Sequence, residues 1–337
     1  MKHAMTALKI APLFQPLDAE LNATVDFLQG LLPPEALTLA DATTYSLSTL
    51  GKLVRPAMVH ALWQAITGKP SDDRVVKLAA VTEMIHLATL LHDDVLDEAD
   101  LRRGKSTVRQ RFGNRIAILG GDWLLAQASQ TLASLGNLQL VSFYAQVLAE
   151  LCEGEVLQDA LAYQPLAEIS WDAYTQKTYK KTASLYVCLA KSVAVLAEAD
   201  DLTMQKAIDF GTSFGMAFQF HDDLLDYTAD ATDLGKPILD DIRNGLANAP
   251  ILLLFQEESQ QAFLEEAVQT IFNLVQEQAP LEAIDQACVA LKEALHQQGG
   301  ITLTQALIDS TRQDAQSALN HFKAGQGLSI LEALLKA

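Results

Sequence analysis

The sequence has few cysteines, and none of them lies near another. Cys152, Cys188 and Cys288 are odd in number and form no CxxC pair in the 337 residues. This spacing excludes a disulfide-rich secreted scaffold and a zinc site built from paired thiolates. We therefore expect three reduced thiols in a reducing compartment.

Long uninterrupted apolar runs are also missing. Residues 1–10 lack the continuous hydrophobic stretch of a signal peptide. The longest apolar stretch, Leu185–Ala199, is interrupted by Lys191 and Ser192 and is shorter than the roughly 20 residues of a membrane-spanning helix. These absences predict a soluble, cytoplasmic protein without an integral membrane segment.

Positive charge is scarce relative to negative charge. The chain has 24 lysines and arginines against 42 aspartates and glutamates, which gives a formal net charge of −18. Such an acidic surface disfavours binding to nucleic acid and to anionic membranes. We therefore expect no nucleic-acid partner, and an anionic substrate would need locally placed basic side chains or metal ions.

Strand-like runs rich in Val, Ile and Thr are scarce, and most of the sequence has the apolar spacing of helices. Between Val75 and Leu96 the apolar residues cover much of the helix circumference, as expected for a helix inside a bundle. Similar helices are expected at 116–132, 138–158, 182–199, 204–227 and 249–257, with two peripheral ones at 260–278 and 281–297. Since no low-complexity linker divides the chain, we predict one all-α domain over residues 1–337, although length alone would favour two.

Two acidic boxes with the pattern Asp-Asp-x-x-Asp lie at the ends of strongly apolar helices. They comprise Asp93, Asp94 and Asp97 in the first box and Asp222, Asp223 and Asp226 in the second. Carboxylates this close repel one another unless cations neutralise them. Oxygen ligands suit a hard cation, and magnesium shares its shell between carboxylates, waters and substrate phosphates. The boxes therefore predict a magnesium site.

Basic residues follow each box. Segment 102–105 (Arg-Arg-Gly-Lys) begins five residues after Asp97, and Lys236 lies ten residues after Asp226. Arginine and lysine side chains bind phosphate oxygens. A single box or a single basic turn is more often a solvated surface, but together they supply the parts of a diphosphate site.

Four segments, in chain order, resemble motifs of the trans-isoprenyl diphosphate synthases. They are 51–56 (Gly-Lys-Leu-Val-Arg-Pro), 83–105 with the first box, 181–183 (Lys-Thr-Ala) and 214–237 with the second box. The resemblance extends from about Gly51 to Pro250. It implies the isoprenoid-synthase fold, a bundle of mainly antiparallel helices around a deep central cavity, and a homodimer.

The resemblance also implies a role for each motif residue at the allylic substrate. The six aspartates hold about three magnesium ions around an allylic prenyl diphosphate. That diphosphate is contacted by Arg102, Lys181 and Lys236, while Thr182 and Gln219 lie near its allylic group. Gln219 precedes Asp222 by three residues and shares its helix face.

The second substrate that the resemblance implies is isopentenyl diphosphate, bound by Lys52, Arg55, His86 and Arg103. His86 lies seven residues, or two helical turns, before Asp93 and shares its face. A histidine on an apolar helix is more often a satisfied core residue, but this register favours a ligand.

The chemistry follows from these parts. Metal ions and cationic side chains stabilise negative charge on the leaving diphosphate, and an apolar cavity shields the allylic cation from water. The double bond of isopentenyl diphosphate attacks the cation, and loss of a proton completes one five-carbon addition. No motif side chain is an obvious strong base, which agrees with the proton removal by released diphosphate that the resemblance implies.

Ala88 and Thr89 lie about one turn before the first box, along the path expected for the growing product. The resemblance implies that bulky aromatic residues at these positions shorten the product. Because both side chains are small, we predict a long-chain synthase that makes products of about eight to ten isoprene units. Ordinary helix packing is the alternative explanation of the two residues.

Three leucines occupy positions where the family commonly has other residues. Leu53 replaces an arginine, Leu239 a glycine and Leu246 a lysine. The lost cations could weaken diphosphate binding or transfer that role to Arg243. Because all six aspartates are retained, we favour an active enzyme.

Two other functions remain open from the sequence. One is a non-catalytic or chain-length-modifying subunit of a heteromeric prenyl synthase, although such subunits typically lose an acidic box. The other is a helical di-iron protein, because 83–86 and 293–296 have the ExxH spacing, but that function leaves both boxes unexplained. Head-to-head condensing enzymes and terpene cyclases fit segments 51–56 and 102–105 less well.

Overall fold

A computed structural model describes residues 12–31, 37–102, 104–229 and 239–336. Within these ranges the regular elements are helices, apart from a hairpin of β1 (Leu101–Arg102) and β2 (Lys105–Ser106). The chain forms two compact units, residues 1–145, 185–211 and 316–337 in the first and residues 146–184 and 212–315 in the second. The all-α class is confirmed, whereas a single domain over residues 1–337 stays a prediction.

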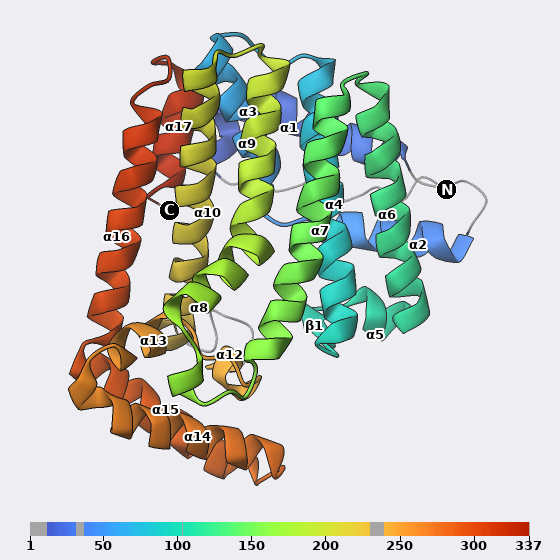
Figure 1. Cartoon of the computed structure of the whole chain (residues 1–337). Helices are drawn as coiled ribbons and strands as arrows, with labels where there is room; N and C mark the ends of the chain where they lie inside the picture. The colour runs from blue at the N-terminus through green and yellow to red at the C-terminus, as the bar shows by residue number, and fades with distance from the viewer. Residues whose placement is uncertain (1–11, 32–36, 103, 230–238, 337) are drawn as a thin grey trace. The chain divides into compact units, whose positions relative to one another are not determined.

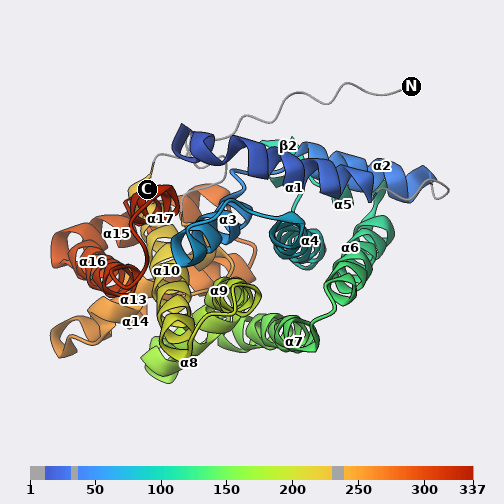
Figure 2. The ribbon, with the colours of Figure 1, turned by 90° about the horizontal axis from the view of Figure 1, so that it is seen from above.

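The first unit is built around α4 (Asp73–Leu96). Its other complete helices are η1 (Pro12–Leu17), α1 (Asp18–Gly30), α2 (Leu37–Ser48), α3 (Val54–Thr67), α5 (Val108–Phe112), α6 (Asn114–Ser134) and α17 (Gln326–Leu334). α4 packs against α1, α3 and α6, and Figure 2 shows α1 lying across α3 and α4. Every residue from Leu78 to Ile85 is buried, as its all-round apolar pattern predicts.

α4 is also the one helix among the described residues that is long and apolar enough to cross a membrane. However, 67% of its most apolar 18-residue window is buried inside the protein. The core helix of a folded protein has the same length and composition, so α4 is only weak evidence for a membrane span.

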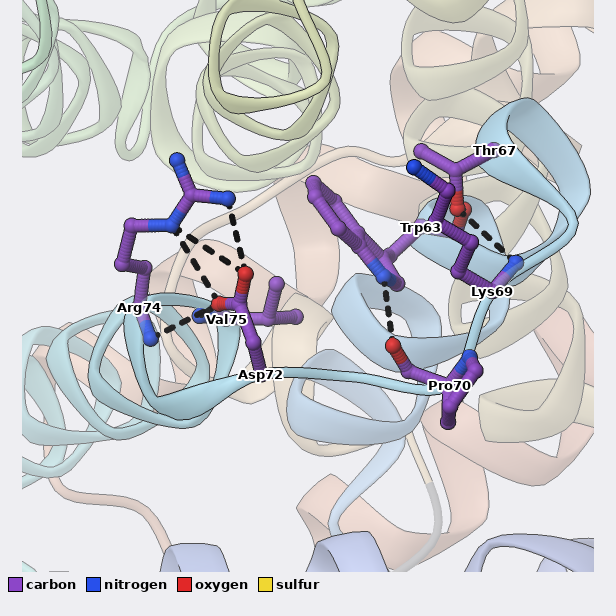
Figure 3. Close-up of polar contacts among 7 residues, drawn as sticks. All are labelled: Trp63, Thr67, Lys69, Pro70, Asp72, Arg74 and Val75. Atoms are coloured by element: carbon purple, nitrogen blue, oxygen red, sulfur yellow. Dashed lines mark hydrogen bonds and ion pairs between the residues drawn. The ribbon is translucent and has the colours of Figure 1, made fainter.

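A network in the α3–α4 connection fixes the start of α4 (Figure 3). The Asp72 side chain caps the helix by accepting hydrogen bonds from the backbone N–H groups of Arg74 and Val75, at 2.9 and 3.3 Å. Trp63, on α3, donates its indole N–H to the Pro70 carbonyl at 3.0 Å. An N-cap sets the residue at which a helix begins. These contacts therefore help to determine where the last turn of α4, which carries the first box, is placed.

The second unit places short helices beside an amphipathic pair. Its complete elements are η2 (Leu166–Glu168), α8 (Trp171–Thr178), η3 (Tyr179–Ala183), α12 (Asp240–Arg243), α13 (Ala249–Phe255), η4 (Glu258–Gln260), α14 (Gln261–Gln276) and α15 (Leu281–Gln298). α14 and α15 lie side by side (Figure 1), and each buries one row of apolar residues, such as Leu264 and Val268 on α14. This packing agrees with the amphipathic pattern expected at 260–278 and 281–297.

Four helices have residues in both units: α7 (Leu138–Leu161), α9 (Ser184–Leu196), α10 (Asp201–Thr228) and α16 (Gly300–Leu319). The helix expected at 182–199 differs from the prediction at its start. Thr182 and Ala183 belong to η3, which is a π-helical turn, and α9 begins only at Ser184. A π turn contains one more residue than an α turn and is frequent at functional sites.

Candidate active site

The first box lies at the end of α4 and presents its carboxylates in two directions. Asp93 and Asp97 share one face by their spacing, with Asp93 half-buried and Asp97 exposed. Asp94 is buried and accepts a hydrogen bond from Arg102 Nε at 2.8 Å. Burial raises the pKa of Asp94 above its ordinary value, and the Arg102 guanidinium opposes that rise. The ion pair thus places Arg102 beside the box.

The β1–β2 hairpin carries Arg102 toward this aspartate. Gly104, in the turn, has a φ of +72°, a conformation that glycine adopts without steric cost. The Tyr45 hydroxyl donates to the Ser106 carbonyl at 2.6 Å and ties the second strand to α2. Arg103 lies outside the described residues.

The other residues predicted to bind isopentenyl diphosphate differ in exposure. Lys52 is exposed, whereas Arg55 and His86 are half-buried. The Arg55 guanidinium carbon lies 4.8 Å from the centroid of the Tyr186 ring, and Arg55 Nε is buried without a hydrogen-bond partner. A buried N–H without an acceptor is costly, so the chemistry of this nitrogen suits a phosphate oxygen.

The second box, on α10, buries two of its three carboxylates. Asp222 is exposed, whereas Asp223 and Asp226 are buried. Asp226 accepts hydrogen bonds from the backbone N–H groups of Asp240 and Asp241, at 3.1 and 3.3 Å. These bonds anchor the start of α12 to α10.

Asp223 accepts hydrogen bonds from three donors. The Tyr174 hydroxyl donates to Oδ2, Gln219 Nε2 donates to Oδ1 at 2.9 Å, and the Ala249 backbone N–H donates to Oδ2 at 3.1 Å. Burial raises the pKa of Asp223, and the nearby charge of Lys177 opposes that rise. This aspartate therefore connects α10 to α8 and to the start of α13.

Lys181 and Thr182 lie in η3, where the π turn packs against Gly154 of α7. A Cβ added at Gly154 would lie 2.8 Å from the Lys181 backbone nitrogen, so glycine permits this close approach. Lys181 Nζ forms an ion pair with Glu155 at 2.6 Å. Thr182 Oγ1 donates to Gln219 Oε1 at 2.7 Å, which brings two predicted site residues together.

Three residues of this arrangement were not among the predicted site residues: Tyr174, Gly154 and Glu155. Gly154 had a local signal, because a glycine inside an apolar helical pattern often marks a close backbone approach. Tyr174 had none, because its partner Asp223 lies 49 residues away in the sequence.

The three leucines that depart from the family pattern are described as well. Leu53 and Leu239 are buried, and both have left-handed backbone conformations with φ of 53° and 55°. That conformation costs a non-glycine residue roughly 1–2 kcal/mol, a cost that burial of a leucine offsets. Leu246 is half-buried. Arg243 forms an ion pair with Asp285 of α15 at 2.6 Å, so its guanidinium is engaged within the second unit.

The residues predicted to limit product length differ in exposure. Ala88 is fully buried, and Thr89 is half-buried. The Thr89 hydroxyl donates to the His86 carbonyl at 2.8 Å, a bond within α4. Lys236, predicted to contact the allylic diphosphate, lies outside the described residues.

The carboxylates of the two boxes suit a hard divalent cation, although they do not supply a complete set of ligands. Within each unit, the described part of the chain contains no group of three or more His, Cys, Asp or Glu side chains that could hold a metal ion. Asp93, Asp97 and Asp222 are the box residues with exposed surface. Their hard oxygens fit a cation that takes its remaining ligands from water and diphosphate, as magnesium commonly does.

Comparison with known proteins supports the same chemistry. Residues 37–284 match the family described as polyprenyl synthetase. A prenyl transferase from Synechocystis sp. is 38% identical, over 77% of this chain and 83% of the relative. Solanesyl diphosphate synthase 1, chloroplastic, from Arabidopsis thaliana is 32% identical, over 91% of this chain and 73% of the relative.

Two solved structures have the same fold. Heptaprenyl diphosphate synthase from Staphylococcus aureus superposes with a TM-score of 0.85 at 26% identity, covering 95% of this chain and 96% of that one. A polyprenyl synthase from Caulobacter crescentus, complexed with calcium and isoprenyl diphosphate, gives a TM-score of 0.84 at 29% identity, covering 96% and 95% of the two chains.

These matches confirm the predicted isoprenoid-synthase fold and a prenyltransferase that makes trans-polyprenyl diphosphates. They argue against the di-iron alternative. They also agree with use of a divalent metal, as in the calcium complex of the Caulobacter relative. The chain belongs to the polyprenyl synthetase family.

Proposed function

We propose that the chain uses magnesium to condense isopentenyl diphosphate, head to tail, onto an allylic prenyl diphosphate. The observation that carries the proposal is that each acidic box leaves carboxylate surface exposed, at Asp93 and Asp97 in the first and at Asp222 in the second. Cationic side chains stand close by in sequence or in space, as Arg102 does at Asp94. Anions can thus bind despite the net charge of −18.

Magnesium, about three ions as the family resemblance implies, would be held by the box aspartates and would neutralise charge on the departing diphosphate. Arg102 and Lys181 are assigned to oxygens of the allylic diphosphate, together with Lys236. Lys181 is ion-paired with Glu155, and a diphosphate would compete with that glutamate for the ammonium group.

Isopentenyl diphosphate is assigned to Lys52, Arg55, His86 and Arg103. The unsatisfied buried Nε of Arg55 supports this assignment, because a diphosphate oxygen would supply its missing acceptor. The Tyr186 ring beneath the guanidinium restricts the orientation of Arg55. Arg55 thus orients the diphosphate so that the double bond of the substrate can meet the allylic carbon.

Thr182 and Gln219 are assigned to the carbon that becomes positive when the diphosphate leaves. Oxygen atoms with free lone pairs stabilise a developing positive charge when they are fixed in advance. The Thr182–Gln219 hydrogen bond of 2.7 Å restricts both side chains. The proton released after carbon–carbon bond formation is assigned to the diphosphate that has left.

For the product, we propose a long chain of about eight to ten isoprene units. The support is the small size of Ala88 and Thr89, together with relatives named solanesyl and decaprenyl diphosphate synthases. Ala88→Phe and Thr89→Phe should each shorten the product while turnover is retained. Of the two, Thr89 lies closer to the Asp93 face by helical register, so the stronger effect is expected there.

We also propose a homodimer. Ile118 and Leu119 on α6 and Leu138 and Val141 at the start of α7 are exposed apolar residues, and exposed apolar patches commonly mark protein interfaces. Sedimentation at micromolar concentration should give twice the chain mass, and Leu119→Glu should reduce it. A cytoplasmic location stays a prediction, since plant relatives carry the descriptions chloroplastic and mitochondrial.

The proposed activity is tested with the purified chain, farnesyl diphosphate, labelled isopentenyl diphosphate and magnesium. We expect labelled long-chain product, which a chelator abolishes. If no label is incorporated under any metal condition, the enzyme proposal is wrong. If incorporation requires a second, different chain, the subunit alternative holds instead, and products of only about three or four units would contradict the long-chain proposal alone.

A further inference from the structure

A chain of hydrogen bonds in the second unit runs from α8, through α10, to the π turn. Tyr174 donates its hydroxyl to Asp223 Oδ2. Gln219, one turn earlier on α10, donates Nε2 to Asp223 Oδ1 at 2.9 Å. The other end of the Gln219 amide, Oε1, accepts the hydroxyl of Thr182 at 2.7 Å. Four side chains from three elements are thus connected in series.

This series fixes which way the Gln219 amide faces. Asp223 Oδ1 accepts a hydrogen bond from the amide, and the amide has one donor end and one acceptor end. Asp223 therefore requires the NH₂ group, and the amide oxygen is left for Thr182. The Thr182 hydroxyl donates its hydrogen bond to that oxygen. The lone pairs of the Thr182 oxygen take no part in this bond. If the amide were reversed, its NH₂ group would face Thr182, and the positive end of the amide dipole would lie beside the Thr182 oxygen.

Tyr174 holds the aspartate in the orientation that the series requires. Tyr174 and Asp223 are 1% and 2% exposed, so water does not replace a missing donor easily. The Tyr174 ring lies beside those of Trp171 and Phe220, with centroids 5.1 and 6.3 Å away. Its hydroxyl and the Ala249 N–H both occupy Oδ2, which leaves Oδ1 to Gln219.

We propose that Tyr174 is a positioning residue for the prenyl-transfer site, acting through Asp223 on the Gln219 amide and on the Thr182 hydroxyl. The inference rests on the proposed function and adds to it a residue that lies outside all four sequence motifs. Tyr174 itself touches no reacting group in this scheme. Its effect is to orient the Thr182 oxygen toward the carbon that becomes positive.

Tyr174→Phe removes the hydroxyl and keeps the ring, so it tests the proposal directly. We expect kcat to fall about ten-fold or more, the factor for about 1.4 kcal/mol, while the KM for isopentenyl diphosphate changes less than about two-fold. The matched control is Tyr144→Phe, because Tyr144 is also 1% exposed and bonds Thr82 at 2.7 Å within the first unit. The control should lose stability and keep kcat within about two-fold.

A double substitution separates positioning from a general loss of stability. In a Gln219→Met background the amide is absent, so adding Tyr174→Phe should change kcat no further. If the two effects multiply instead, or if Tyr174→Phe alone behaves as the Tyr144→Phe control does, the proposal is overturned.

A second measurement needs no catalytic activity. In substrate-free protein, the Gln219 side-chain NH₂ signal, identified by its loss in Gln219→Met, should exchange slowly with solvent. Tyr174→Phe should accelerate that exchange about ten-fold, whereas Tyr144→Phe should not. Unchanged exchange in Tyr174→Phe overturns the proposed link even if the chain is active. Faster exchange in an inactive chain would uphold the link and reject the proposed function instead.

Discussion

The two acidic boxes share one sequence pattern but are built in different ways. The first buries one carboxylate, Asp94, and pairs it with the cation Arg102. The second buries two, Asp223 and Asp226, and the hydrogen bonds described for them come from a phenol, an amide and backbone N–H groups. The first box fixes one cationic side chain that can contact substrate, and the second fixes both side chains and backbone of neighbouring segments.

This difference separates the expected effects of substitution. A charged group at the surface contributes little to stability, whereas a buried acceptor with several donors contributes much more, because its loss leaves those donors unsatisfied. Substitutions at Asp93 and Asp97, which are half-buried and exposed, should therefore change activity before stability. Substitutions at the buried positions of the second box should change stability as well.

The largest effect is expected at Asp93. Asp93→Asn should lower kcat by roughly 10²–10³, as removal of one preorganised electrostatic group does in other enzymes. The free energy of unfolding should stay within about 0.5 kcal/mol, because repulsion within the box is reduced. Asp73→Asn, at the other end of α4, is the control and should keep kcat while the loss of its exposed ion pair with Lys77 changes the free energy of unfolding by less than about 0.5 kcal/mol. A large loss of stability in Asp93→Asn would contradict the proposed division between the boxes.

The next largest effect concerns stability and compares Asp226 with Asp97. Asp226→Ala should lower the free energy of unfolding by about 2–3 kcal/mol, because the N–H groups of Asp240 and Asp241 lose their acceptor. Asp97→Ala, at the equivalent position of the first box and exposed, should change it by less than about 0.5 kcal/mol. Denaturant titration measures both, and equal losses would remove the contrast.

A smaller effect is expected at Glu155. This residue belongs to neither box and forms an ion pair with Lys181. Glu155→Gln removes a half-buried ion pair and should raise the affinity for inorganic diphosphate by about three-fold, or roughly 0.6 kcal/mol. Glu153→Gln is the matched control, since Glu153 pairs with the neighbouring Lys180. Calorimetry with diphosphate and magnesium measures both variants, and a lower affinity in Glu155→Gln would mean that the glutamate supports binding.

The smallest effect is a pH dependence at Asp94. Its pKa is raised in the folded protein, mainly by burial, so the native state binds the proton more tightly than the unfolded chain. The ionised carboxylate therefore lowers stability as the pH rises from about 4, the ordinary pKa, through the raised folded value. Relative to Asp94→Asn, the wild-type protein should lose stability as the pH rises above about 4, and the opposite slope would contradict this.

Patterns that repeat within one helix were predictable from the sequence. The buried helix expected at 75–96, both boxes and the amphipathic pair expected at 260–278 and 281–297 follow from apolar periodicity and from i, i+4 spacing. The cationic partner of the first box was also within reach, because Arg102 lies only eight residues from Asp94.

The division of roles inside the second box was not predictable, because it depends on contacts between distant segments. Asp223 meets Tyr174 across 49 residues and Ala249 across 26, and no periodicity connects these positions. The left-handed conformations of Leu53 and Leu239 could not be predicted from the sequence for a different reason. Leucine carries no turn signal, and burial of its side chain helps to keep each residue in a conformation that glycine would adopt freely.

The π turn at Tyr179–Ala183 makes this region sensitive to chain length as well as to residue type. It contains one residue more than an α turn, and removal of that residue would rotate the chain before it by about 100° relative to the chain after it. Tyr174 precedes the turn and Thr182 lies within it, yet both contact the same short stretch of α10, at Asp223 and Gln219. A one-residue deletion here would break one of the two contacts, so variants of this enzyme should tolerate substitutions at the turn residues other than Lys181 and Thr182 better than they tolerate gaps.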